Sequence, residues 1–128
     1  ATYLSAIFDP DRAQGPDLYM WSHGSRTGSP ARYLALFTSF NIPPNGSNGA
    51  FYQNPEYDAL YKTAVATADP LERAKLYGEM QKLLVEDPPQ ITIGETSLSW
   101  GLRNNVKGLV SFLGDARIPG GWYYIYKE

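Results

Sequence analysis

Two helix starts of the same design follow one another in the stretch NPEYDALYKTAVATADPLERAKLYGEM, residues 54–80. Asn54-Pro55 and Asp69-Pro70 each place a short capping residue before a proline, which is favoured at the first position of a helix. Apolar residues then recur on one face of each run. Because almost no linker separates them, the two runs predict a tight antiparallel or angled helix pair.

The apolar face of each run predicts what each helix buries. Glu72 stands three residues after Asp69, which is the spacing of a capping box. Each cap contributes on the order of 1 kcal/mol. The predicted stripes comprise Tyr57, Leu60, Tyr61, Ala64 and Ala68 in the first helix and Leu76, Tyr77, Met80, Leu83 and Leu84 in the second.

Apolar runs outside the helix pair predict strands. DLYMW, residues 17–21, is apolar on both faces, as a central strand is when helices cover both sides of its sheet. QITI (90–93) and the alternating SLSWGLR (97–103) are typical of short strands, and GWYYIY (121–126) indicates an aromatic strand. Residues 1–8 could be the end of a helix that stops at Asp9-Pro10, and a further helix is expected after Ser29-Pro30 through ARYLALF. The element order is that of an α/β or α+β domain, of which we favour α/β, with the helix pair packed on a small mixed sheet.

Composition excludes several function classes. A length of 128 residues is that of one domain. The net charge is −2 and the basic residues are scattered, so the chain lacks the clustered basic surface of a nucleic-acid binder. The absence of cysteine excludes disulfides and thiolate chemistry. With one histidine and no suitably spaced carboxylates, we expect no metal and no cofactor. Ten tyrosines and three tryptophans suit a surface that grips organic ligands, a well-packed core or a lobe interface.

The loop that follows residue 21 holds the few groups that could carry chemistry. A hydrolase that uses Ser22 or Ser25 with His23 is one hypothesis, although a serine and a histidine adjacent in sequence rarely face each other. The nucleophile pattern G-x-S-x-G is absent, since Arg26 occupies its serine position. The segment 24–28 could instead cradle an anion around Arg26 or simply form a turn at the surface.

The position of this loop favours ligand binding over catalysis. In open α/β sheets, ligands lie in the crevice beyond the carboxyl ends of the strands. Trp21, Ser22, His23 and Gly24 would stand at such an end, where Trp21 offers a stacking surface and its neighbours offer hydrogen bonds. The alternatives are that Trp21 belongs to the core and that His23 lies in a solvated loop. No catalytic residue is predicted.

Glu95 and Thr96 complete the predicted ligand-binding set. They follow QITI and could approach the same crevice, whereas the alternative is that Glu95 points to water. Trp100, at strand spacing, fits the core better than a site.

The helix pair and the segment after it resemble the C-terminal portion of the extracellular solute-binding proteins of bacterial ABC importers. This family contains oligopeptide-, dipeptide- and nickel-binding proteins, and the likeness covers about residues 17–110. Its motifs N-P-x-x-D, R-x-x-L-Y-x-x-x-Q, E-D-x-P and V-x-G correspond here to Asn54, Pro55 and Asp58; Arg73, Leu76, Tyr77 and Gln81; Glu86, Asp87 and Pro89; and Val106 and Gly108.

The resemblance implies a two-lobed protein, several times longer than this chain, that encloses a solute between its lobes and presents the closed form to a membrane permease. Residues 1–108 would form the C-terminal part of the second lobe, and residues 109–128 a tail that returns to the missing N-terminal lobe. The chain is then expected to be a non-enzymatic domain or fragment, periplasmic or extracellular, with anchoring as a lipoprotein left open. Since each lobe supplies half of the contacts, the chain alone should bind solutes weakly.

One departure from the family concerns the solute. In peptide-binding members, the loop after the strand's tryptophan often carries an aspartate that pairs with the peptide's amino terminus. Here residues 22–25 follow Trp21, and the loop holds no carboxylate. A buried ammonium group needs a negative partner. The sequence therefore leaves sugars, other polar solutes and modified peptides open beside peptides.

A third hypothesis, beside a solute-binding domain and a hydrolase, is a self-contained protein-interaction module built on the aromatic tail. If GWYYIY (121–126) normally pairs with a lobe missing here, an apolar edge would face water. Self-association of the chain is therefore expected.

Overall fold

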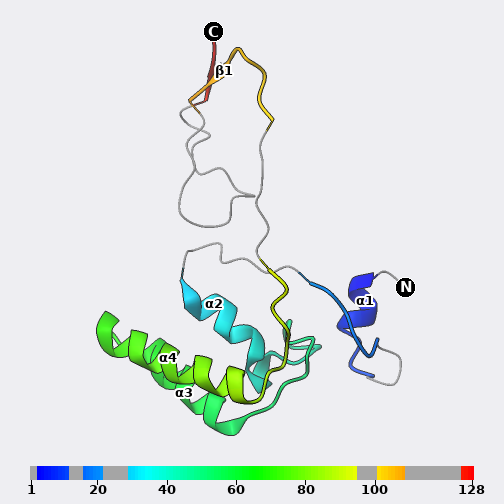
Figure 1. Cartoon of the computed structure of the whole chain (residues 1–128), viewed down its shortest axis with the longest axis vertical. Coiled ribbons are helices and arrows are strands. Elements are labelled where there is room, and N and C mark those ends of the chain that lie inside the picture. Colours follow the sequence, from blue (N-terminus) through cyan, green and yellow to red (C-terminus); the bar gives the residue numbers. More distant parts are fainter. Residues whose placement is uncertain (1–2, 12–15, 22–28, 95–100, 109–124) are drawn as a thin grey trace. The chain divides into compact units, whose positions relative to one another are not determined.

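The computed structural model describes residues 3–11, 16–21, 29–94, 101–108 and 125–128 of the chain (Figure 1). They belong to two compact units: a helical unit of residues 1–23 and 30–91, and a β unit of residues 24–29 and 92–128. From the N-terminus onwards, the elements are α1 (Tyr3–Ile7), α2 (Pro30–Leu34), the 3-10 turns η2 (Ala35–Phe37) and η3 (Ser39–Asn41), α3 (Pro55–Ala66), α4 (Pro70–Glu86), β1 (Val106–Lys107) and β2 (Tyr126–Lys127).

The predicted helix pair is confirmed, including its caps. Asn54 Oδ1 accepts hydrogen bonds from the second and third backbone N–H groups of α3, at 3.0 and 3.1 Å. Asp69 Oδ1 does the same for α4, at 2.7 and 3.0 Å. The carboxylate of Glu72 lies 2.7 Å from Lys75 Nζ, in an exposed pair that contributes little to stability. Both helices therefore begin where the capping residues and prolines place them.

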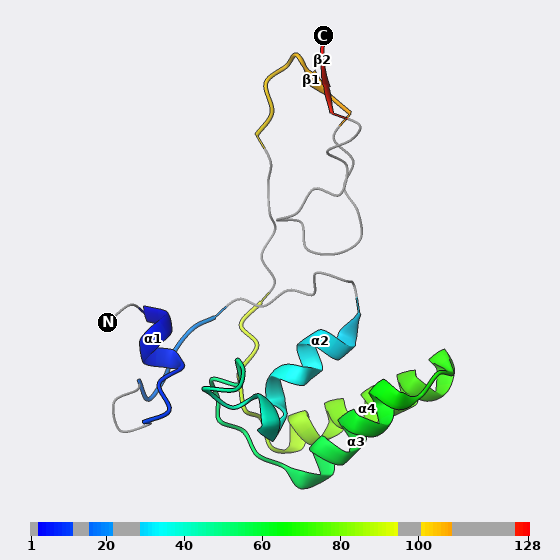
Figure 2. The same cartoon turned by 180° about the vertical axis from the view of Figure 1, so that it is seen from behind.

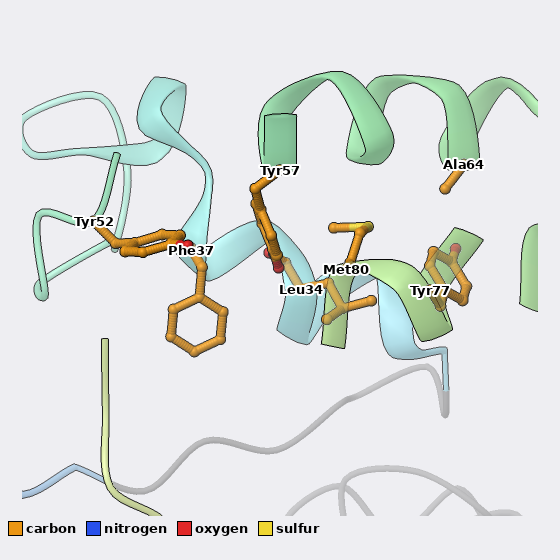
Figure 3. Packing of buried hydrophobic residues seen from close by; sticks show 7 residues of the cluster. All are labelled: Leu34, Phe37, Tyr52, Tyr57, Ala64, Tyr77 and Met80. Carbon is orange, nitrogen blue, oxygen red and sulfur yellow. The ribbon is translucent and has the colours of Figure 1, made fainter. Parts of the chain in front are cut away.

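The core of the helical unit lies where α3 and α4 pack against each other and against α2 (Figure 2). Both predicted stripes are confirmed with one exception. Ala68 is wrong, because α3 ends at Ala66 and Ala68 stands exposed in the short connection to α4. Figure 3 shows the buried residues of this core, which are Leu34, Phe37, Tyr52, Tyr57, Ala64, Tyr77 and Met80.

Two of the predicted strands, at residues 17–21 and 90–93, are not present. Residues 17–21 form no strand, and Leu18 and Met20 are 87% and 73% exposed. Residues 90–93 form none either, with Ile91 and Ile93 exposed. Of the predicted aromatic strand, residues 121–124 lie outside the described residues, and Tyr126 is in β2. A strand needs a partner strand to satisfy its backbone groups, and the sequence pattern alone does not supply one.

The packing of the helix pair on a mixed sheet stays a prediction, since the described helices and the described sheet belong to separate units. The helices pack on α2 and on the segment 38–52. The sheet described in the structure is the antiparallel pair β1–β2, with Val106 opposite Lys127, and it belongs to the β unit. The predicted turn at Asn104-Asn105 is confirmed, since the Val106 N–H donates to the Arg103 carbonyl at 2.9 Å. The fold is thus a small helical unit and a small β unit.

The Asn48 side chain connects Thr38 to Tyr52 across the turn that precedes α3. Asn48 is 1% exposed, and its Nδ2 donates to the Thr38 carbonyl at 3.0 Å and to the Tyr52 carbonyl at 2.9 Å. Its Oδ1 accepts from the Tyr52 N–H at 3.2 Å. These bonds span a turn in which Phe51 has φ 55°, a left-handed conformation that costs on the order of 1 kcal/mol for such a residue. Asn48 therefore stabilises a turn that would otherwise be unfavourable.

Candidate functional site

Trp21 is the one predicted ligand-binding residue within the described part of the chain. Its indole meets Phe8 edge to face, with ring centroids 5.6 Å apart, and 36% of the residue is exposed. An aromatic ring held on one side and open on another can still stack on a ligand. The other predicted site residues, Ser22, His23, Gly24, Glu95 and Thr96, lie outside the described residues, as do Ser25, Arg26 and Trp100. The site as a whole stays a prediction.

The segment that carries Trp21 is held on one face by α1. The Tyr3 hydroxyl accepts from the Met20 N–H at 3.1 Å and donates to the carbonyl of the same residue. The Tyr19 side chain lies against the backbone of Gly49. A Cβ added to Gly49 would lie 2.6 Å from the Tyr19 hydroxyl and 2.8 Å from Ile7 Cγ2. A larger residue at Gly49 would require these side chains to shift. The position of Trp21 is thus set by packing between α1 and the turn at Gly49.

The motif residues of α3 and α4 have structural roles. Asp58 accepts hydrogen bonds from the Ser39 N–H, at 2.9 Å, and from the Ser39 hydroxyl, which attaches η3 to α3. Arg73 Nη1 donates to the Thr67 carbonyl at 3.3 Å and so braces the connection between the two helices. Gly108 follows β1 with φ 80°, which favours glycine. These residues build the scaffold and present no ligand-binding group.

Tyr57 is the buried polar anchor of the core. It is 0% exposed, and its hydroxyl donates to the Leu34 carbonyl at 2.7 Å. Burial raises the pKa of Tyr57 well above its usual range, and nearby tyrosines add to this shift. Burial also raises the pKa of Tyr61. Both phenols are therefore neutral in the folded protein well into alkaline solution.

This shift predicts how stability responds to pH. Above about pH 10 an unfolded tyrosine ionises, whereas folded Tyr57 keeps its proton. The unfolded state then binds fewer protons, and the free energy of unfolding falls as pH rises. Tyr57→Phe is expected to cost about 1 kcal/mol at neutral pH and to lessen the alkaline loss. Urea unfolding at about pH 7 and pH 11 measures both effects, and an alkaline loss as large in the variant as in the parent protein would contradict the assignment.

The described residues offer no alternative site of clear chemistry. Among them, no group of three or more His, Cys, Asp or Glu side chains is placed to hold a metal ion. No helix of the described part is long and apolar enough to cross a membrane. A shallow, open depression lies on α4, lined by Gly78, Gln81, Lys82, Val85 and Glu86, and includes none of the predicted site residues.

Several known binding proteins are similar in sequence to this chain. Di/tripeptide-binding protein 4 of Pseudomonas aeruginosa is 32% identical over 94 residues, which are 73% of this chain and 18% of that protein. Glutathione-binding protein GsiB of Salmonella typhimurium is 36% identical over 73 residues, 57% of this chain and 14% of that protein. The probable D,D-dipeptide-binding periplasmic protein DdpA of Escherichia coli is 32% identical over 63 residues, 49% of this chain and 12% of that protein.

These relatives confirm the resemblance drawn above from the motifs of α3, α4 and the segment that follows. The chain spans less than a fifth of the length of each of the three. No family model matches the chain, and no solved structure does.

Proposed function

We propose that this chain is part of the solute-binding protein of an ABC importer and helps to capture a small peptide-like or other polar solute for transport. The observation that carries the proposal is its similarity to binding proteins for di- and tripeptides, glutathione and D,D-dipeptides. In support, the motif residues Asn54, Asp58 and Arg73 act within the helical scaffold, as expected of a lobe that presents its site on neighbouring loops.

The uneven cover of residues 17–21 supports a role for further polypeptide. The sequence predicts burial of both faces, but α1 and Gly49 cover only the face that carries Tyr19 and Trp21. Leu18 and Met20, on the other face, are among the most exposed apolar residues described. Apolar side chains clustered in water mark an interaction surface. We infer that another part of a longer binding protein, outside this chain, covers the face that carries Leu18 and Met20.

The solute class follows from the relatives and from the loop after Trp21. The three named relatives bind di- and tripeptides, glutathione or D,D-dipeptides, which favours a compound with a free carboxylate and an amide backbone. The loop 22–28 carries His23 and Arg26 and no carboxylate. It therefore suits the anionic end of such a solute, and the partner for an amino group would come from elsewhere in the protein.

Calorimetric titration of the complete polypeptide encoded by the gene tests the function. We expect binding of a dipeptide, a tripeptide, glutathione or D-alanyl-D-alanine, and weaker or no binding by this chain alone. Trp21→Ala should weaken binding roughly fivefold through the loss of about 1 kcal/mol of ring contact. Val85→Ala, at an exposed aliphatic on α4, is the matched control and should bind as the parent does.

The outcomes of this titration separate the proposals. Failure of all four solutes and of sugars to bind would overturn the solute-binding role. Binding that is unchanged in Trp21→Ala would remove Trp21 from the site and leave the function standing. Hydrolysis of an ester or peptide that is lost in His23→Ala would instead favour the hydrolase hypothesis.

The remaining expectations form part of this proposal. A periplasmic or extracellular location and an ABC permease as partner accord with relatives that bind solutes, one of which is named as periplasmic. A lipid anchor, the boundary between residues 108 and 109, and self-association through the aromatic tail stay predictions.

A further inference from the structure

Two Asn-Gly dipeptides, Asn45-Gly46 and Asn48-Gly49, lie three residues apart in opposite environments. Asn-Gly is chemically labile in water, because a glycine, which has no side chain, lets its backbone nitrogen reach the preceding asparagine side chain. Asn45 is exposed, whereas Asn48 is buried. We propose that Asn45 is a site of spontaneous deamidation and that the fold protects Asn48 from the same reaction.

The reaction needs only water. The Gly46 nitrogen attacks Cγ of Asn45, a ring bond forms between these two atoms, and the bond from Cγ to the amide nitrogen Nδ2 breaks. The departing nitrogen takes up the Gly46 amide proton and leaves as ammonia. Water then opens the cyclic imide at either carbonyl and yields aspartate or isoaspartate. Overall, an amide and one water become a carboxylic acid and ammonia, and the acid passes its proton to the ammonia to give a carboxylate and an ammonium ion.

At Asn48 both reacting groups are engaged. The side-chain amide holds three hydrogen bonds, to Thr38 and Tyr52, and the Gly49 N–H donates to the Ser47 carbonyl at 2.9 Å. With 1% of the residue exposed, water has little access to it. A carboxylate there would also be a buried charge beside two carbonyl oxygens, which is unfavourable. Reaction at Asn48 therefore requires the turn to open first.

At Asn45 the reacting groups lie at the surface. Its backbone N–H donates to the Ile42 carbonyl at 2.9 Å and fixes a turn, but among the described residues neither its side chain nor the Gly46 N–H is hydrogen-bonded. The reactive glycine is also required by packing. A Cβ on Gly46 would lie 2.6 Å from the Asn41 carbonyl oxygen and 2.8 Å from Asn41 Cα. Backbone atoms cannot yield easily, so the fold retains a labile dipeptide at this turn.

The two sites serve as each other's control in one experiment. The full-length protein is incubated in mildly alkaline buffer, once folded and once in concentrated urea, and the peptide that carries both sites is fragmented in a mass spectrometer. In urea, both asparagines should deamidate. In the folded protein, Asn45 should deamidate while Asn48 is slowed by at least about tenfold relative to urea, because its turn must open.

Two results would overturn the proposal. One is a folded protein in which Asn45 stays intact under conditions that convert it in urea. The other is a folded protein in which Asn48 reacts as fast as Asn45. Asn45→Gln removes the first site without touching the second, so conversion at Asn48 in this variant should match that of the parent.

Discussion

Replacement of Asn48 by alanine is expected to destabilise the helical unit by about 3 kcal/mol. The change removes all three side-chain hydrogen bonds and leaves both backbone groups of Tyr52 without this partner, while the Thr38 carbonyl keeps its bond from the Asn41 N–H. Each buried group left unpaired costs about 1–3 kcal/mol. The left-handed turn at Phe51 loses its support at the same time. Urea unfolding followed by circular dichroism measures the loss.

Two further variants show whether this loss comes from the hydrogen bonds. Asn45→Ala changes the same residue type in an exposed position and should alter stability by no more than about 0.5 kcal/mol. Asn48→Asp keeps the shape but can no longer donate to the two carbonyls, so it should be as harmful as alanine. An Asn48→Ala variant as stable as Asn45→Ala would show that the turn does not depend on this side chain.

Truncation of Met80 to alanine is expected to cost about 2–5 kcal/mol, because it opens a cavity in the centre of the core. Met80 is 0% exposed and lies on α4 among the buried residues that join it to α2 and α3. Val85→Ala, on the exposed side of the same helix, is the matched control and should change stability by no more than about 0.5 kcal/mol. Thermal unfolding of the parent and both variants gives the comparison.

A volume-conserving change separates cavity formation from the chemistry of methionine. Met80→Leu keeps most of the side-chain volume and should cost less than about 1.5 kcal/mol. Equal losses in Met80→Ala and Val85→Ala would mean that the helix pair is not the centre of the folded unit.

The part of the fold that could be predicted from the sequence is the part set by local signals. A cap, a proline and a repeating apolar face lie within a few residues of one another, so α3 and α4 could be predicted from the sequence. The one error is the end of α3, which lies at Ala66, two residues before the predicted stripe ends at Ala68. Residues 17–21 depend on distant partners, and apolar content alone did not show that one face would be covered and the other bare. Asn48 was missed for the same reason, since its burial results from contacts with Thr38 and Tyr52 across a turn.

In the candidate site, too, the sequence indicates local features but not contacts between distant residues. Trp21 was proposed from its place at the end of an apolar run, and although it is partly exposed, its role at a ligand site stays a prediction. Its support could not be predicted, because Phe8, Tyr3 and Gly49 reach it through tertiary packing. A glycine whose Cβ would clash is recognisable only once the polypeptide has folded around it.

The contact between Tyr3 and Met20 limits how other polypeptides can add to this region. In an antiparallel ladder, a strand residue exchanges its N–H and C=O with one residue of its neighbour. The Tyr3 hydroxyl is hydrogen-bonded to both of these groups of Met20, as a residue of an adjacent strand would be. An incoming strand on that edge must first displace α1. Endless sheet growth requires two open edges, and α1 closes the edge of this segment at Met20.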